Sequence, residues 1–141
     1  MRRDYFTVDV HSEPADEGTP TISIEYTGPS GGLRERLAAE SGTLDADDID
    51  VTLRHQPSDE DGVLSLSNRL TGEYILEATV PTAAILKLVT AAEDRDDGQY
   101  EVRLTDADGK SLVYEKQTLL VYDHDGSLRR SQSLIPGGVQ L

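Results

Sequence analysis

Several residue types are missing from this chain or scarce in it. The sequence contains no cysteine and no tryptophan, a single phenylalanine and only three lysines. Without cysteine there is no disulfide framework, no thiolate metal site and no cysteine nucleophile. No apolar run approaches the roughly 18 residues that a membrane-spanning helix needs, and no apolar signal region is present at the N-terminus. We therefore expect a soluble, folded protein.

Positive charge is also scarce, because 27 acidic residues outnumber 13 basic ones and give a formal net charge of -14. Aspartate (16) exceeds glutamate (11), and arginine (ten) replaces lysine as the main cation. Halophiles use such a charge excess, since in molar salt the Debye length is about 3 Å and carboxylate repulsion is screened. The composition predicts a halophilic protein of the haloarchaeal cytoplasm. An acidic patch is therefore interpreted first as a sign of habitat.

The chain has 141 residues, which predicts one domain over 1–141 with a core of its own. Alternating apolar and polar residues predict strands at 5–10, 21–27, 49–54, 63–68, 74–80, 100–104, 112–116, 118–123 and 127–135. Helical spacing and end signals predict one helix at 33–40 and a second from 81–82 to 94–98. The expected fold class is α+β, a mainly antiparallel β-sheet of about 8–9 strands with two helices packed on one face.

Two further patterns bear on the arrangement of these elements. The run 119–122 is apolar on both faces, which is typical of a central strand covered by helices. Strand, helix, strand, turn and strand follow one another at 21–68 and again at 74–116. A duplication would predict a pseudo-two-fold core with both helices side by side. The same order can arise without duplication, so both explanations stay open.

Three Asp-x-Asp-Gly segments occur at 59–62, 106–109 and 123–126. A calcium loop begins in this way, but it also needs a bidentate glutamate at its twelfth position. The residues at that position are Leu70, Gln117 and Leu134. We therefore interpret the segments as turns between strands, because Asp and Gly accept positive φ. We expect no metal site and no cofactor.

Residue patterns for catalysis are weak. His11, His55 and His124 are scattered, and none has a second histidine four residues further on, as a zinc-binding helix would. His11 and His55 could still meet in space. No Gly-x-Ser-x-Gly nucleophile elbow is present. We expect no catalytic residues.

A glycine-rich break at 28–32 separates a predicted strand from a predicted helix, which is where phosphate-binding loops occur. The break lacks the Gly-Lys-Ser/Thr ending of such a loop, although a helix N-terminus can hold an anion. A plain strand-to-helix break is the default. The candidate ligand site comprises Ser30, Gly31, Gly32 and His55.

The charged residues and the C-terminal residues limit the classes of binding partner that we expect. Arg2-Arg3 and Arg129-Arg130 are the only paired basic residues, and molar salt removes most of the counterion-release gain, so neither nucleic acid nor a membrane is expected as partner. The chain ends on apolar residues after a Pro-Gly-Gly break, and these could cover the protein's own core or dock into another chain. We expect a protein partner or a homodimer, with Val139 and Leu141 as candidate contacts.

Three segments carry a resemblance to a known family: the opening Met-Arg-Arg-Asp-Tyr-Phe-Thr at 1–7, Val-Tyr-Glu-Lys-Gln-Thr-Leu-Leu-Val-Tyr-Asp at 113–123, and Ser-Leu-Ile-Pro-Gly-Gly-Val at 133–139. The chain resembles, over its full length, a small haloarchaeal family classed as a domain of unknown function. The resemblance implies a halophilic source but no activity, ligand or site residue.

Two function classes remain. The first is a non-catalytic interaction or scaffold module that docks a partner or a second copy through a sheet face or edge. The alternative is a small-molecule-binding protein or hydrolase with a site near the 28–32 junction. A deep pocket with perturbed titrating groups would favour the alternative, and a plain surface with one apolar patch would favour the module.

Overall fold

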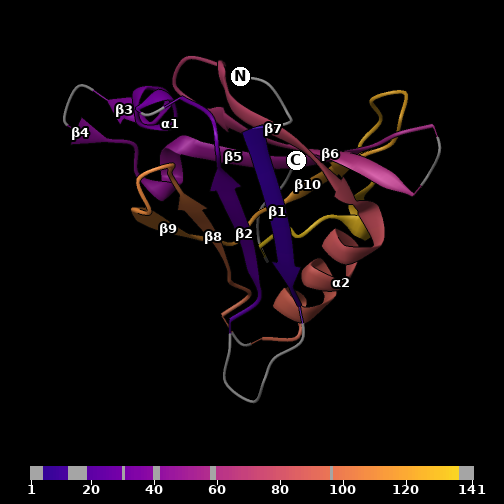
Figure 1. Cartoon of the computed structure of the whole chain (residues 1–141). Coiled ribbons are helices and arrows are strands. Elements are labelled where there is room, and N and C mark those ends of the chain that lie inside the picture. The colour runs from indigo at the N-terminus through magenta and orange to yellow at the C-terminus, as the bar shows by residue number, and fades with distance from the viewer. Residues whose placement is uncertain are drawn as a thin grey trace.

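Two four-stranded sheets packed face to face make up most of the structure, a computed structural model that describes residues 5–12, 19–29, 31–39, 42–57, 60–95 and 97–136 (Figure 1). The first sheet has the order β1 (Phe6–His11), β2 (Thr21–Tyr26), β8 (Tyr100–Thr105) and β9 (Ser111–Lys116). The second sheet has the order β10 (Leu120–Tyr122), β5 (Ile49–His55), β6 (Asp61–Asn68) and β7 (Tyr74–Pro81). Strands of the second sheet run across those of the first in Figure 1.

Each sheet contains one parallel pair of strands. β2 and β8 are parallel in the first sheet, and β10 and β5 are parallel in the second, whereas the other neighbouring strands are antiparallel. The smaller elements are the hairpin of β3 (Ala38–Ala39) and β4 (Gly42–Thr43) and the 3-10 turns η2 (Ala46–Asp48) and η3 (Arg130–Gln132).

The strands form where apolar and polar residues alternate. In β5, for example, Ile49, Val51 and Leu53 are buried while Arg54 is exposed. The structure also confirms the predicted strands at 5–10, 21–27, 63–68, 74–80, 100–104 and 112–116. Burial alternates in β2 and β8, whereas β6 is buried on both faces from Gly62 to Leu66.

The longer predicted helix is confirmed as α2 (Thr82–Glu93), which begins after Pro81 and buries a stripe of Ile85, Leu88, Val89 and Ala92. It packs along the side of the sandwich where the edge strands β1 and β7 contact each other. The helix predicted at 33–40 is shorter: α1 (Gly32–Arg36) has five residues. It ends because the chain turns into the β3–β4 hairpin, where the Leu44 nitrogen donates to the Leu37 oxygen at 2.8 Å.

The predicted single sheet with two helices on one face is wrong. Alternation locates strands but not their partners, and the two parallel pairings sort the strands into two sheets of four. α1 and α2 lie at opposite ends of the sandwich in Figure 1, so they are neither side by side nor on one face.

Two predictions about the C-terminal part of the chain are also wrong. Within the run 119–122, Leu120–Tyr122 form β10, which is an edge strand of the second sheet and not a central one. The strand predicted at 127–135 contains only two isolated bridges, Leu119–Leu134 and Tyr122–Leu128, together with η3. This irregular segment bonds to the outer edge of β10. Val121 is buried, but Leu120 and Tyr122 stay partly exposed, so β10 is not covered on both faces as the apolar run predicts.

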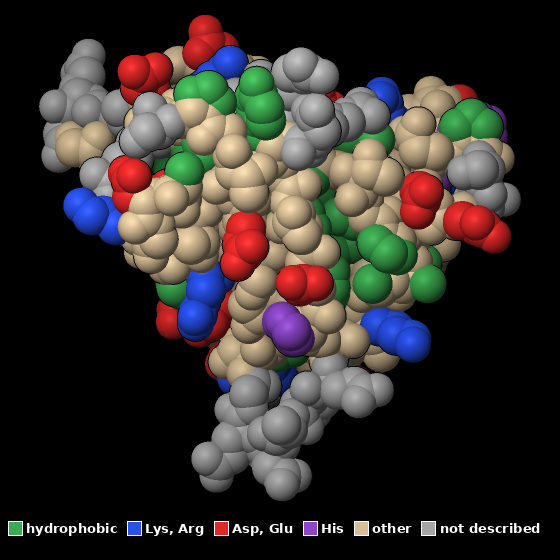
Figure 2. All heavy atoms as spheres, viewed as in Figure 1, with side chains coloured by type: hydrophobic (Ala, Val, Ile, Leu, Met, Phe, Trp, Pro, Cys, Tyr) green, Lys and Arg blue, Asp and Glu red, His purple; other side chains and the backbone are tan. Residues whose placement is uncertain are grey.

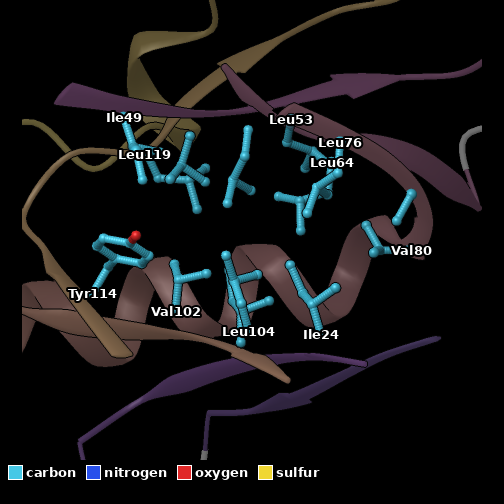
Figure 3. Packing of buried hydrophobic residues seen from close by; sticks show 14 of the residues in the cluster. Ile24, Ile49, Leu53, Leu64, Leu76, Val80, Val102, Leu104, Tyr114 and Leu119 are labelled. Atoms are coloured by element: carbon cyan, nitrogen blue, oxygen red, sulfur yellow. The ribbon is translucent and has the colours of Figure 1, made fainter. Parts of the chain in front are cut away.

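The core lies between the two sheets, where their side chains point toward one another (Figure 3). Ile24, Val102 and Leu104 come from the first sheet, and they face side chains such as Leu53 and Leu64 from the second. Each fully buried side chain of this size contributes about 1.5–3 kcal/mol relative to exposure. In the described part of the chain, none of the helices has the length and apolar character that crossing a membrane would require.

Candidate functional site

The edges of the two sheets differ in how they are covered. β1 and β7 contact each other. The outer edge of β10 is bonded to the segment that follows it: the Leu119 and Leu134 backbones exchange hydrogen bonds of 3.0 and 2.8 Å, and the Val121 nitrogen donates to Ser133 Oγ at 2.8 Å. Among the described residues, no strand or loop pairs with the outer edge of β9. Within this described part of the chain, β9 is therefore the open edge.

Two hydrogen bonds show which backbone groups of β9 face outward. The Asp106 nitrogen donates to the Lys110 oxygen at 2.8 Å, and the Glu101 nitrogen donates to the Pro20 oxygen, away from β9. In an antiparallel pair the bonded and non-bonded positions alternate. Asp106 and Lys110 are a bonded pair, so Leu112, Tyr114 and Lys116 are the β9 residues whose backbone groups bond to β8. The backbone groups of Ser111, Val113 and Glu115 therefore point outward, away from β8.

Two large apolar side chains are exposed on this open edge. Leu112 is 39% exposed and Val113 is 48% exposed, and they lie on opposite faces of the sheet because they are consecutive in a strand. Soluble proteins usually protect such an edge with charge, proline or a covering segment. The open edge of β9 is thus apolar at its middle, with Glu115 near one end and Lys110 near the other.

The flat face of the first sheet offers less to a partner. Its outward side chains are mainly hydroxyl-bearing and charged, such as Thr7, Asp9 and Glu25. Hydrophobic side chains are sparse at the centre of this face in Figure 2, which has the viewpoint of Figure 1. The apolar surface of the first sheet is therefore concentrated at the β9 edge.

A hollow of about 560 Å³ lies beside the open edge, between α1, the β3–β4 hairpin and the β8–β9 hairpin. Its apolar lining comes from Leu33, Leu37, Leu104 and Leu112, and its polar lining includes Asp106 and Lys110. Gly31 has φ of 84° and allows the turn that sets Leu33 and Leu37 on this side.

The predicted ligand residues do not gather in one place. Gly31 and Gly32 adjoin the hollow through Leu33, and Ser30 lies outside the described residues. Arg36 of α1 donates to the Tyr74 oxygen at 2.8 Å. Tyr74 pairs with Ser67, and Ser67 pairs with Asp50, so α1 lies at the end of the second sheet where β5 begins. His55 ends β5, about 17 Å further along at 3.3 Å per residue.

The histidines have separate surroundings. His55 Nε2 lies 2.8 Å from Gln132 Oε1 of η3. His11 instead lines a shallow hollow with Ala84 and Lys87 of α2. The candidate partner residues Val139 and Leu141 lie outside the described residues.

The 28–32 junction is fixed by packing against Tyr26. Tyr26 Oη donates to the Pro29 oxygen at 2.9 Å, and a Cβ atom at Gly28 would lie only 2.5 Å from that hydroxyl. Glycine is therefore required at Gly28 by the close approach of a tyrosine ring of the same chain.

Both Asp-x-Asp-Gly segments inside the described ranges form turns, and the segment at 59–62 is described only from residue 60. Asp106 Oδ1 accepts the Asp108 and Lys110 nitrogens at 3.0 Å, and Gly109 has φ of 83°. In the second turn, Asp123 Oδ1 accepts the Ser127 nitrogen at 2.9 Å. Within the described ranges, no three His, Asp or Glu side chains stand close enough together to hold a metal ion.

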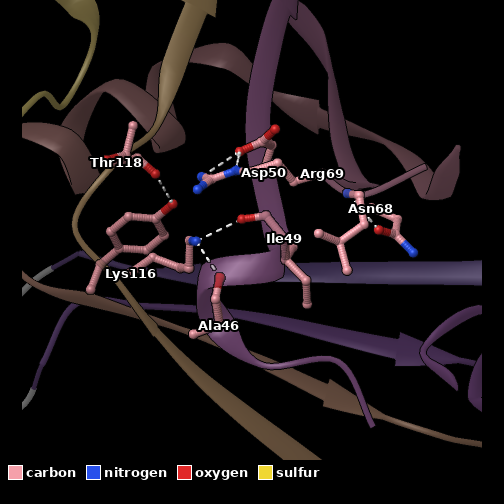
Figure 4. A network of polar contacts seen from close by, with 9 residues as sticks. Ala46, Ile49, Asp50, Asn68, Arg69, Lys116 and Thr118 are labelled. Atoms are coloured by element: carbon pink, nitrogen blue, oxygen red, sulfur yellow. Dashed lines mark hydrogen bonds and ion pairs between the residues drawn. The ribbon is translucent and has the colours of Figure 1, made fainter. Parts of the chain in front are cut away.

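Lys116 is a buried cation that positions the open edge (Figure 4). Its Nζ donates to the Ala46 and Ile49 oxygens, both at 2.6 Å, and the residue is only 7% exposed. Burial lowers the pKa of Lys116, and nearby Arg69 adds to this, while the carboxylate of Asp50 opposes it. Lys116 thus fixes one end of β9 to the second sheet.

Sequence reasoning missed the β9 edge and Lys116. Two signals were present. The apolar run Leu112-Val113-Tyr114 interrupts the alternation of apolar and polar residues. Lys116 lies two residues after buried Tyr114, so both side chains lie on the same face of the strand. Alternation alone does not reveal whether a strand lies at an edge, so neither signal was enough.

These features define a two-layer, mostly β protein with one long helix and an open, apolar sheet edge. The chain belongs to the family of unknown function DUF5793, which it matches over residues 1–141. Neither a curated protein nor a solved structure matches it.

Proposed function

We propose that this protein is a non-catalytic interaction module that docks a strand of another chain at the open edge of β9. The observation that carries the proposal is the open edge itself, with outward backbone groups at Ser111, Val113 and Glu115 and exposed Leu112 and Val113 beside them. In strand addition, main-chain hydrogen bonds supply affinity and adjoining pockets select side chains. The hollow beside Leu112 is placed to act as such a pocket.

The proposed setting is a haloarchaeal cytoplasm. The net charge of -14, the excess of aspartate and the three lysines support it. At molar salt, repulsion between carboxylates is screened over about 3 Å, so an acidic chain can approach a partner closely.

The test is capture of partners by immobilised protein from a lysate of its own cells in about 2 M KCl, where surface charges are screened. Val113→Lys places a charge at the middle of the edge, and we expect it to remove the captured proteins. Thr7→Lys is the matched control, because Thr7 is exposed on the same outer face of the first sheet but lies in β1, the strand at the opposite edge from β9. Equal capture by wild type and Val113→Lys would contradict docking at this edge.

The alternative is small-molecule binding or hydrolysis next to the 28–32 junction. The hollow of about 560 Å³ supports binding, because ligand pockets commonly have volumes of about 300–1,000 Å³. A fragment screen by NMR tests it: shifts confined to Leu33, Leu104 and Leu112 would favour this alternative, and no shifts there would contradict it.

A further inference from the structure

We propose that the strand docked on the open edge is β9 of a second copy of this chain, antiparallel to the first and related to it by a two-fold axis at Val113. This inference rests on the proposed docking function and names its partner. The pairing would join two four-stranded first sheets into one continuous sheet of eight strands.

The backbone of β9 is self-complementary in this register. The outward groups belong to Ser111, Val113 and Glu115, so a centre at Val113 pairs each Ser111 with Glu115 of the second copy and Val113 with itself. Each such pair exchanges two bonds, which gives about six hydrogen bonds across the edge. A centre at Leu112 or Tyr114 would leave one of the three outward positions beyond the end of the opposing strand.

The side chains of β9 also match in this register. Val113 meets Val113 of the second copy on the outer face, and Leu112 lies beside Tyr114 of the second copy on the inner face. Glu115 lies opposite Ser111, so no carboxylates are directly opposed. Lys110 falls opposite Lys116 of the second copy at each end of the interface, where the Lys116 ammonium is already bonded to the Ala46 and Ile49 oxygens. A centre at Glu115 would bring two carboxylates together, and a centre at Ser111 would run the partner into the Asp106–Gly109 turn.

The net charge of each copy makes the pairing depend on salt concentration. Each copy carries a net charge of -14, and Asp45, Asp47 and Asp48 lie at or next to η2, which contacts β9. Repulsion between copies opposes association in dilute salt and is screened in molar salt. The second copy is therefore a partner that binds more strongly as the KCl concentration rises, the opposite of a basic peptide held by charge attraction.

The first experiment is sedimentation equilibrium of the purified chain at up to about 1 mM, a range that reaches weak interfaces. We expect a monomer–dimer equilibrium in about 2 M KCl that shifts toward monomer as salt is lowered within the range where the chain stays folded. Val113→Lys should weaken dimerisation at least tenfold, and Thr7→Lys should not. A wild type that stays monomeric in 2 M KCl at the highest concentration would overturn the inference.

The register has its own test, which uses the absence of cysteine from the chain. Ser111→Cys and Glu115→Cys proteins are mixed and treated with a short bis-maleimide cross-linker in about 2 M KCl, with Thr7→Cys in β1 as the control. We expect the mixed dimer to form faster than either homodimer, and Val113→Cys alone to cross-link to itself. Equal rates for all combinations would overturn the Val113-centred pairing.

The outcomes separate this inference from the function on which it rests. If the purified chain stays monomeric while Val113→Lys loses a captured protein, the second copy is the wrong partner and docking at β9 stands. If Val113→Lys changes neither self-association nor capture, docking at β9 is also wrong.

Discussion

The side-chain nitrogen of Lys116 lies 2.6 Å from the backbone oxygen of Ile49, so the last residue of β9 holds the first residue of β5. The same nitrogen holds the Ala46 oxygen of η2. Because β9 and β5 belong to different sheets, this contact ties the two layers at the edge of the first sheet opposite β1.

Replacing this lysine should loosen the sandwich. Lys116→Met removes the donor from two backbone oxygens while keeping most of the side-chain volume. An unsatisfied buried acceptor costs about 1–3 kcal/mol, and we expect a loss of unfolding free energy in that range. Urea unfolding in molar KCl measures it. Lys87→Met on the exposed face of α2 is the control and should change stability by less than about 0.5 kcal/mol.

Two buried tyrosines should respond differently to loss of their hydroxyl. Tyr100 Oη donates to the Thr118 oxygen at 2.8 Å, whereas Tyr114 Oη is buried and has no hydrogen-bond partner. Tyr100→Phe should therefore cost about 1 kcal/mol, and Tyr114→Phe should be neutral or stabilising. Thermal unfolding of both variants under one buffer decides this, and a larger loss for Tyr114→Phe would reveal a missed contact of its hydroxyl.

Alkaline pH should destabilise the fold through Tyr100. Complete burial raises the pKa of Tyr100 well above its usual value of 10.0. Above pH 10 the unfolded tyrosine loses its proton while the folded one keeps it, so stability falls as pH rises, by up to about 1.4 kcal/mol per pH unit for this one group.

The lowered pKa of Lys116 acts in the opposite direction and at lower pH. Between that pKa and about 10.4 the unfolded chain holds more protons, so stability rises with pH. Unfolding by urea at several pH values, with Tyr100→Phe as comparison, isolates the tyrosine contribution. A slope above pH 10 that is unchanged in Tyr100→Phe would contradict the assignment.

The turn between β8 and β9 should be more sensitive at its glycine than at its second aspartate. Gly109 has φ of 83° with open space around it, so Gly109→Val is penalised by backbone strain alone. We expect a loss of about 1–3 kcal/mol for Gly109→Val and little change for Asp108→Asn, because Asn tolerates turn conformations. Micromolar calcium binding that disappears in Asp108→Asn would instead indicate an ion site.

The fold should need about molar salt. A net charge of -14 on 141 residues destabilises the compact state by self-repulsion until the Debye length falls to a few ångströms. Circular dichroism across a KCl series should show a melting temperature that rises with salt. A cooperative fold whose melting temperature in 50 mM salt equals that in 2 M would contradict the prediction of a halophilic protein.

Local patterns predicted local structure well and distant pairing poorly. The alternation in β5 was sufficient to locate that strand, and Pro81 was sufficient to locate the start of α2, because both signals depend on neighbours in sequence. The division into two sheets depends on pairings such as Ile22–Val102 and Val121–Leu53, which no local pattern encodes. The open edge of β9 could not be predicted for the same reason, since whether a strand lies at an edge depends on how every other strand of its sheet is paired.

The parallel pairing of β2 with β8 and of β5 with β10 has a consequence for synthesis of the protein. β2 can form with β1 early, but its other neighbour is translated only when the chain has reached Glu101 and beyond. β5 likewise can pair with β10 only after Leu120 and the residues that follow it have been translated. Neither layer can be completed on the ribosome before most of the polypeptide has emerged, so we expect late, slow folding dominated by distant contacts, with apolar strands uncovered in the interval.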